Sequence, residues 1–284
     1  MARGLHGNGT WQPSRHLQRS PMNRRTAIGW IGSLSLLTVS NNFAQVVDLN
    51  DAINKAGRQR MLSQRVAKAY LAAGQGVVTQ RAGEVLTTSM ALFERQLVEL
   101  KAFSPTPDVK ATYSELETHW NDLRAMLVGQ APVRENAPAV IDLDGKVLAL
   151  ANKGTSQLEQ VSGKPLGRLV NIAGRQRMLS QRVAKFYLAM AWKVPLPTAQ
   201  AELDKARAEF VSALDVLANA PEATTAIKQE IELARAQWVF YSAALAQQGA
   251  DAPTPERSAN IFASSENILA VMDKVTGMYS RLTT

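Results

Sequence analysis

The segment AGRQRMLSQRVAK at residues 56–68 occurs twice in this chain, because the same thirteen letters return unchanged at residues 173–185. Each copy carries three arginines and one lysine but no acidic residue. The similarity continues on both sides of the segment: INKAGRQRMLSQRVAKAYLA at 53–72 aligns with VNIAGRQRMLSQRVAKFYLA at 170–189, an offset of 117 residues. A duplication of this length indicates two homologous halves.

Aromatic residues outside the duplicated segment keep nearly the same spacing. Phe93 recurs as Phe210 at the offset of 117, and Trp120 matches Trp238 after a slip of one residue. Large aromatic side chains at matching positions of two helical repeats are typical of a packed core. We therefore expect all four to be core residues.

Turn signals divide each half into four stretches. They read AGQG, SPTPD and GQAP in the first half, and KVPLPT, NAPEA and QQGADAPTP in the second. The stretches between them lack the alternation of strands and are about 20 residues long, as in helical bundles. We predict an all-α fold with two tandem antiparallel four-helix bundles related by pseudo-two-fold symmetry, at residues 45–160 and 161–284.

Residues 1–44 are predicted to be an export signal. Paired arginines at 24–25 precede the apolar run TAIGWIGSLSLLTV, which is too short to span a bilayer but suits a signal peptide. We expect cleavage after Ala44, export by the Sec or the twin-arginine route, and a periplasmic or secreted protein. Two alternatives stay open: a true start at Met22, and retention of the segment as a membrane anchor.

The formal net charge of +8 is unevenly distributed along the chain. Five arginines and no acid lie in residues 1–44, so the remainder carries +3. The two thirteen-residue segments hold four cations each, which leaves −5 for everything else. Surfaces that bind nucleic acid spread their cations and add aromatic residues. We therefore expect no nucleic-acid partner.

The composition offers little material for catalysis. The chain has no cysteine, which excludes disulfides and thiolate metal sites, and only three histidines. A histidine zinc site or a Ser/His/Asp triad has few residues to draw on. We expect no enzyme activity, no cofactor and no metal site.

The stretch Asn-x-Ala-Gly-Arg-Gln-Arg-Met-Leu-Ser-Gln-Arg, at residues 54–65 and 171–182, resembles the signature of the PilJ-like family. That family is the N-terminal sensor domain of type IV pili methyl-accepting chemotaxis transducers, related to the periplasmic domain of nitrate and nitrite sensor kinases. The resemblance covers the chain after the signal as two tandem copies. It implies helical-bundle homodimers whose first helices meet and hold one anion between their arginines. By position the matching arginines are Arg60, Arg65, Arg177 and Arg182.

The residues also suggest an anion site through their chemistry. On a helix, Arg58 and Arg65 lie about 20° apart, while Arg60 points about 140° from Arg65. A second copy facing the first across a pseudo-two-fold axis supplies the missing directions. Clustered guanidiniums repel one another and lose hydration, and a bound oxyanion would offset that cost. Gly57 and Gly174 fit a place where two backbones, or a backbone and a ligand, approach closely.

The predicted ligand-binding residues are Arg60, Arg65, Arg177, Arg182, Gly57, Gly174, Arg58, Arg175, Asn54 and Asn171. For Arg58 and Arg175 a structural role is an equal alternative. Asn54 and Asn171 either cap a helix or bind the ligand, and the sequence does not separate these roles.

Two classes of function follow. The first is an exported sensing protein that binds a small oxyanion, with nitrate or nitrite favoured. It would signal through a membrane-bound sensor or transporter, because the sequence shows no second membrane span and no further length for a kinase or methyl-accepting region. The second is a pilus or envelope interaction module whose basic helices dock an acidic partner without a small ligand. We expect either a monomer with pseudo-dimeric repeats or a homodimer.

Overall fold

The computed structural model describes residues 45–246 and 253–283. These residues form α-helices joined by short loops and contain no strand, which confirms the predicted all-α fold. The helices are α1 Leu49–Gly74, α2 Thr79–Phe103, α3 Pro107–Leu127, α4 Ala137–Ser162, α5 Pro165–Ala191, α6 Ala199–Ala218, α7 Thr225–Ala246 and α8 Pro255–Ser280, with a short 3-10 helix, η1, at Arg134–Asn136.

Helix boundaries follow the turn signals and local capping chemistry. Asp48 caps α1 by accepting a hydrogen bond from the backbone N–H of Asp51 at 2.8 Å. A Thr-Pro pair opens both α3 and α8: Thr106 and Thr254 are the N-caps, each accepting from a backbone N–H three residues on, and the proline fits the first turn. The predicted turns thus coincide with the ends of the helices in the described residues.

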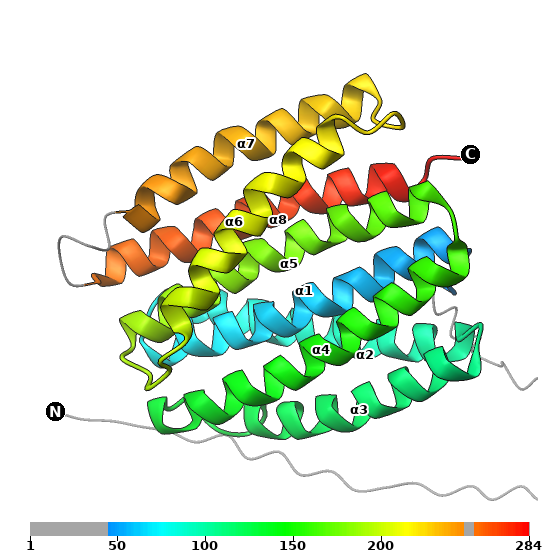
Figure 1. Ribbon diagram of the computed structural model, residues 1–284. Helices are drawn as coiled ribbons and strands as arrows, with labels where there is room; N and C mark the ends of the chain where they lie inside the picture. Colours follow the sequence, from blue (N-terminus) through cyan, green and yellow to red (C-terminus); the bar gives the residue numbers. More distant parts are fainter. Residues whose placement is uncertain (1–44, 247–252, 284) are drawn as a thin grey trace, which may run out of the picture. The chain divides into compact units, whose positions relative to one another are not determined.

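The two halves of the chain are joined through their first helices. α1 and α5 pack more extensively against each other than any other pair of helices, and they run side by side in Figure 1. Around them, α2 and α4 cover α1, while α6 and α8 cover α5. α3 packs on α4 as α7 packs on α8, so each contact in one half has its counterpart in the other. This pattern confirms the pseudo-two-fold relation and places the duplicated segments at its axis.

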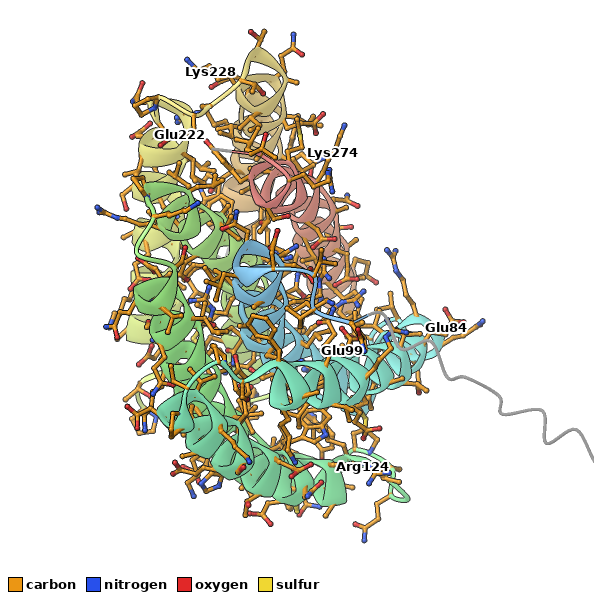
Figure 2. All side chains as sticks on the ribbon, turned by 90° about the vertical axis from the view of Figure 1, so that its right-hand side faces the viewer. Glu84, Glu99, Arg124, Glu222, Lys228 and Lys274 are labelled. Carbon is orange, nitrogen blue, oxygen red and sulfur yellow. The ribbon has the colours of Figure 1, made fainter. Side chains whose placement is uncertain are left out.

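The aromatic residues pack as expected. Phe93 stacks on Trp120 with ring centroids 3.7 Å apart, and Phe210 stacks on Trp238 at 4.3 Å. All four side chains are buried. Charged side chains such as Glu84, Arg124 and Lys228 point outward instead (Figure 2). The described part of the chain therefore has a mainly apolar core and a charged exterior, but four cations of the duplicated segments, Arg60, Lys68, Arg177 and Lys185, are buried.

The predicted export signal at residues 1–44 lies outside the described residues. Within the described ranges, none of the helices combines the length and the apolar character needed to cross a bilayer.

Candidate functional site

The helices α1 and α5 approach each other closely at two glycines. A Cβ atom built on Gly57 would lie 3.7 Å from the Cα of Gly174, and one built on Gly174 would lie 3.8 Å from the Cα of Gly57. These two distances are ordinary van der Waals contacts, but a Cβ at either glycine would also lie 3.2 Å from an arginine Nη2 atom, which is tighter. The duplicated glycines therefore lie where the two repeats cross and leave space for these arginine side chains.

Two arginines extend over this crossing in opposite directions. Nη2 of Arg60 on α1 donates to the backbone carbonyl of Asn171 on α5 at 3.1 Å. Nη2 of Arg177 on α5 donates to the carbonyl of Asn54 on α1 at 2.9 Å. A Cβ on Gly57 would lie 3.2 Å from Nη2 of Arg60 and 3.4 Å from Nη2 of Arg177. Both guanidiniums thus lie beside the same glycine, and both side chains are buried.

Burial and mutual repulsion act on these two cations. Burial, together with the charges of Arg175 and Arg177, lowers the pKa of Arg60 to about 9. Burial also lowers the pKa of Arg177, together with the charge of Arg58, to about 10, although Asp273 opposes this change. Both groups stay protonated at neutral pH. The crossing therefore holds two positive charges removed from water.

The remaining partners of the two arginines differ in charge. Nη1 of Arg177 donates to Asp273 on α8 at 2.6 Å, whereas Nη1 of Arg60 donates to the neutral amide oxygen of Asn152 on α4 at 3.1 Å. Arg58 shares Asp273, at 2.8 Å, and Arg175 shares Asn152, at 3.4 Å. The pseudo-symmetric clusters are thus built alike, but only one contains a carboxylate in contact with its buried arginine.

The carboxylate of Asp273 stays ionised at neutral pH. Burial alone would raise its pKa, but the charges of Arg177 and Arg58 hold the pKa of Asp273 at about 2. One buried cation is therefore neutralised at all ordinary pH values, whereas Arg60 makes direct contact only with uncharged acceptors.

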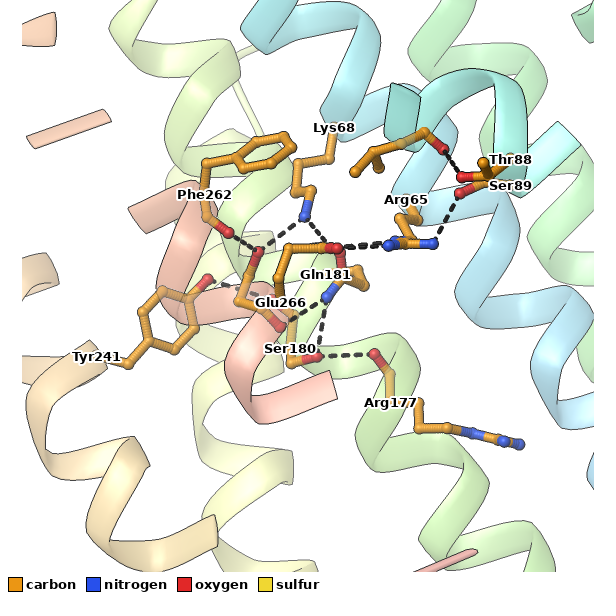
Figure 3. Close-up of polar contacts among 12 residues, drawn as sticks. Arg65, Lys68, Thr88, Ser89, Arg177, Ser180, Gln181, Tyr241, Phe262 and Glu266 are labelled. Atoms are coloured by element: carbon orange, nitrogen blue, oxygen red, sulfur yellow. Dashed lines mark hydrogen bonds and ion pairs between the residues drawn. The ribbon is translucent and has the colours of Figure 1, made fainter. Parts of the chain in front are cut away.

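Arg65 and Arg182 point away from the crossing toward acids. Nε and Nη2 of Arg65 bind the two carboxylate oxygens of Glu266 on α8, at 3.1 and 2.5 Å (Figure 3). Nη2 of Arg182 donates to Glu202 on α6 at 2.6 Å. The predicted set is therefore brought together only in part: Arg60, Arg177 and the two glycines meet, and Arg58 and Arg175 join them through shared partners.

Asn54 and Asn171 lie inside their helices, so they are not caps. α1 begins after Asp48, and α5 begins at Pro165. The side-chain amide of Asn54 donates to Ser280 at 3.5 Å, and that of Asn171 donates to Glu159. Their backbone carbonyls, rather than their side chains, contact the arginines of the crossing.

Sequence reasoning missed the buried acids that pair with the lysines of the segment. Nζ of Lys185 donates at 2.6 Å to Asp144, a fully buried residue of α4 that also accepts two bonds of 2.8 Å from Gln64. Nζ of Lys68 donates to Ser265 at 2.9 Å and to Glu266 at 2.7 Å. Burial lowers the pKa of Lys68 to about 8, although Glu266 opposes the change. No local motif around these acids could have revealed them, because their partners are more than 40 residues away.

The crossing has hydrogen-bonding capacity left over. Nε of Arg60 and Nε of Arg177 are buried and have no hydrogen-bond partner among the described residues. The phenolic oxygen of Tyr113, which interacts electrostatically with Arg60, also lacks one there. Buried donors of this kind normally have an acceptor. A small anion accepts from several donors at once, and this is the chemistry that the arrangement suits.

Comparison with known proteins points to one family. The family model for the type IV pili methyl-accepting chemotaxis transducer N-terminal domain, PilJ, matches residues 42–144 and 162–276. The two matched segments correspond to the two structural halves. A search of curated proteins and a search of solved structures found no match.

Proposed function

The chain belongs to the PilJ family of type IV pili methyl-accepting chemotaxis transducer N-terminal domains, and from this membership we propose that it is an exported sensor that binds a small oxyanion. The family indicates a sensor domain related to chemotaxis. We propose further that the anion is nitrate or nitrite and that the protein is periplasmic. Arg60 and Arg177 would hold the anion at the crossing of α1 and α5.

The observation that carries the proposal is the burial of Arg60 without a carboxylate in contact. Its exposed fraction is 1%, and its guanidinium donates to an amide oxygen and a backbone carbonyl. Burying a guanidinium without a counter-charge is costly, and a fixed anion offsets that cost. A planar guanidinium also donates in a fork that suits oxyanions. Arg60 is therefore the residue that we expect to gain most from a bound anion.

Pseudo-symmetry would let one anion act on both halves of the protein. Arg60 and Arg177 come from different repeats and lie beside the same glycine at the crossing. An anion that both arginines bind would tie α1 to α5 and stabilise one arrangement of the two helices over others. A membrane-bound sensor or transporter could then recognise the liganded arrangement.

Calorimetry with nitrate, nitrite, sulfate and phosphate tests the proposal. We expect the exported protein to bind at least one of these anions, with nitrate or nitrite bound most tightly. A charge-assisted hydrogen bond contributes about 1.5–3 kcal/mol, so Arg60→Ala should weaken binding roughly 10- to 100-fold. Arg168→Ala is the matched control, because Arg168 lies on α5 but is exposed.

Two results would count against the proposal. One is the absence of binding for all four anions. The other is an affinity that Arg60→Ala leaves at the level of Arg168→Ala. If the protein bound no anion but captured an acidic envelope protein, and Arg60→Ala abolished this capture, the docking function would replace the sensor.

A further inference from the structure

A polar cavity of about 270 Å³ lies between α4, α5 and α6. Its donors come from Asn152, Arg175, Arg182 and Lys205. Neither glycine of the α1–α5 crossing lines it, nor does Arg60 or Arg177, so the cavity adjoins the proposed oxyanion site through Asn152 and Arg175 but is a separate space. The equivalent position in the other half of the protein indicates which ligand the cavity could bind.

α4 and α8 are pseudo-symmetric partners at an offset of 121 residues. In this register the buried Val147 matches Ile268, and Thr155 matches Thr276. The contacts agree with the register, because Lys185 donates to Asp144 on α4 as Lys68 donates to Ser265 on α8. Gly145 of the cavity wall therefore occupies the position of Glu266.

Glu266 fills its position with a carboxylate. Its side chain is only 9% exposed and binds Arg65 through both oxygens, with Lys68 2.7 Å from one of them (Figure 3). The charges of Lys68 and Arg65 hold the pKa of Glu266 at about 2, although burial opposes this. In this half, the protein supplies its own carboxylate to the arginine of the repeat.

In the other half, the same position has no side chain. A Cβ built on Gly145 would meet nothing within 4 Å, and the cavity lies beside it. Arg182, the counterpart of Arg65, contacts Glu202 through Nη2. We propose that this cavity binds a small organic carboxylate, whose carboxylate group takes the place beside Arg182 that the Glu266 side chain takes beside Arg65.

The wall of the cavity limits the kind of carboxylate. Met178, Leu179 and Ala206 give it an apolar side that suits a short hydrocarbon chain. Glu202 and Glu209 also line it, against the three cations, so a singly charged ligand fits better than sulfate or phosphate. Butyrate and alanine share the carboxylate and the short chain, and they differ in the ammonium group that the two acids could bind.

Variants at Gly145 test the proposal without touching a lining cation. Gly145→Glu introduces the internal carboxylate that the other half already has, whereas Gly145→Ala adds only a methyl group in open space and serves as the matched control. We expect butyrate or alanine to bind the wild type and Gly145→Ala with similar affinity, and to bind Gly145→Glu at least tenfold more weakly. Gly145→Glu should also melt at a higher temperature than Gly145→Ala without ligand.

Three outcomes of this calorimetric series would overturn the proposal. They are no binding of either probe to the wild type, equal binding to Gly145→Glu and Gly145→Ala, and sulfate binding as tightly as the carboxylates. The inference does not rest on the oxyanion site, because none of these outcomes depends on nitrate or on Arg177.

Discussion

Arg60 and Arg177 exchange hydrogen bonds across the α1–α5 crossing, each donating from Nη2 to the opposite helix, at 3.1 and 2.9 Å. The exchange is nearly symmetric, but the electrostatic surroundings are not, since only Arg177 contacts a carboxylate, Asp273. The two arginines should therefore differ in their effects on stability when no anion is present.

We expect Arg60→Met to be neutral or to raise the free energy of unfolding by up to about 2 kcal/mol. Methionine keeps much of the volume, and removing a buried cation that has no carboxylate in direct contact relieves its desolvation. Arg177→Met should lower the free energy of unfolding by about 1–2 kcal/mol, because it removes a partner of Asp273, whose side chain is 43% exposed. Urea unfolding in an anion-free buffer measures both, and equal losses in the two variants would contradict the asymmetry.

Replacing Gly57 at the crossing with alanine should give a less stable protein than the same change at an unobstructed helical glycine. Alanine in a helix interior is favoured over glycine by about 1 kcal/mol. At Gly83, where a Cβ would meet nothing within 4 Å, we expect Gly83→Ala to show most of this gain. At Gly57 the new methyl group would lie 3.2 Å from Nη2 of the buried Arg60, so Gly57→Ala should be less stable than Gly83→Ala by about 1–3 kcal/mol. Thermal unfolding compares the two, and an equal gain would show that the crossing tolerates a side chain.

The turn after α5 contains a strained residue, Lys193, and glycine at this position should relieve the strain. Lys193 has a φ of 55°, in the left-handed region, and its counterpart in the first half is Gly76, with a φ of 72°. Both follow the end of a first helix and close it with the same pair of backbone hydrogen bonds. Lys193→Gly should therefore raise the free energy of unfolding by roughly 0.5–1 kcal/mol. Lys193→Ala, which keeps the strain, is the control, and an equal effect of both changes would refute this explanation.

Acid should weaken the protein by protonating two carboxylates that bind arginine and lysine side chains, Glu266 and Asp273. Folding lowers the pKa of Glu266 from 4.5 to about 2, so its contribution is complete above pH 4.5 and disappears as the pH falls through 2. The shift corresponds to roughly 3 kcal/mol, and Asp273 adds a smaller amount in the same window because it is more exposed. Chemical denaturation between pH 6 and pH 2 measures the loss. The double variant Lys68→Met with Glu266→Gln removes the pair and should lose less stability over this range; an unchanged pH dependence would contradict the assignment.

Much of the fold could be predicted because its signals are local. The duplicated segment revealed the repeat, and Thr106-Pro107 and the similar pair before α8 marked helix starts through capping chemistry. The sequence also suggested that the two copies face each other at Gly57 and Gly174, but it left open whether they meet within one chain or in a homodimer. In the structure the two glycines approach each other within one chain, although they are 117 positions apart.

The site could be predicted in part, for the same reason. Helical geometry showed that Arg60 points away from Arg65, and the structure agrees, since Arg60 lies at the crossing and Arg65 binds Glu266. The acids that form ion pairs with Arg65, Lys68 and Lys185 come from α4 and α8, where the two halves differ in sequence. Their pairing depends on tertiary packing, which the spacing of residues along one helix does not encode.

The most direct test of the oxyanion site is a double-mutant cycle on nitrate affinity. Calorimetry would measure the dissociation constant of nitrate for the wild type, Arg60→Ala, Arg177→Ala and the variant with both changes. If both arginines bind one anion at the crossing, each single change should weaken binding roughly 10- to 100-fold, and the double change should weaken it little more than one alone. Single variants that keep the wild-type affinity, or losses that simply add, would contradict a shared anion between Arg60 and Arg177.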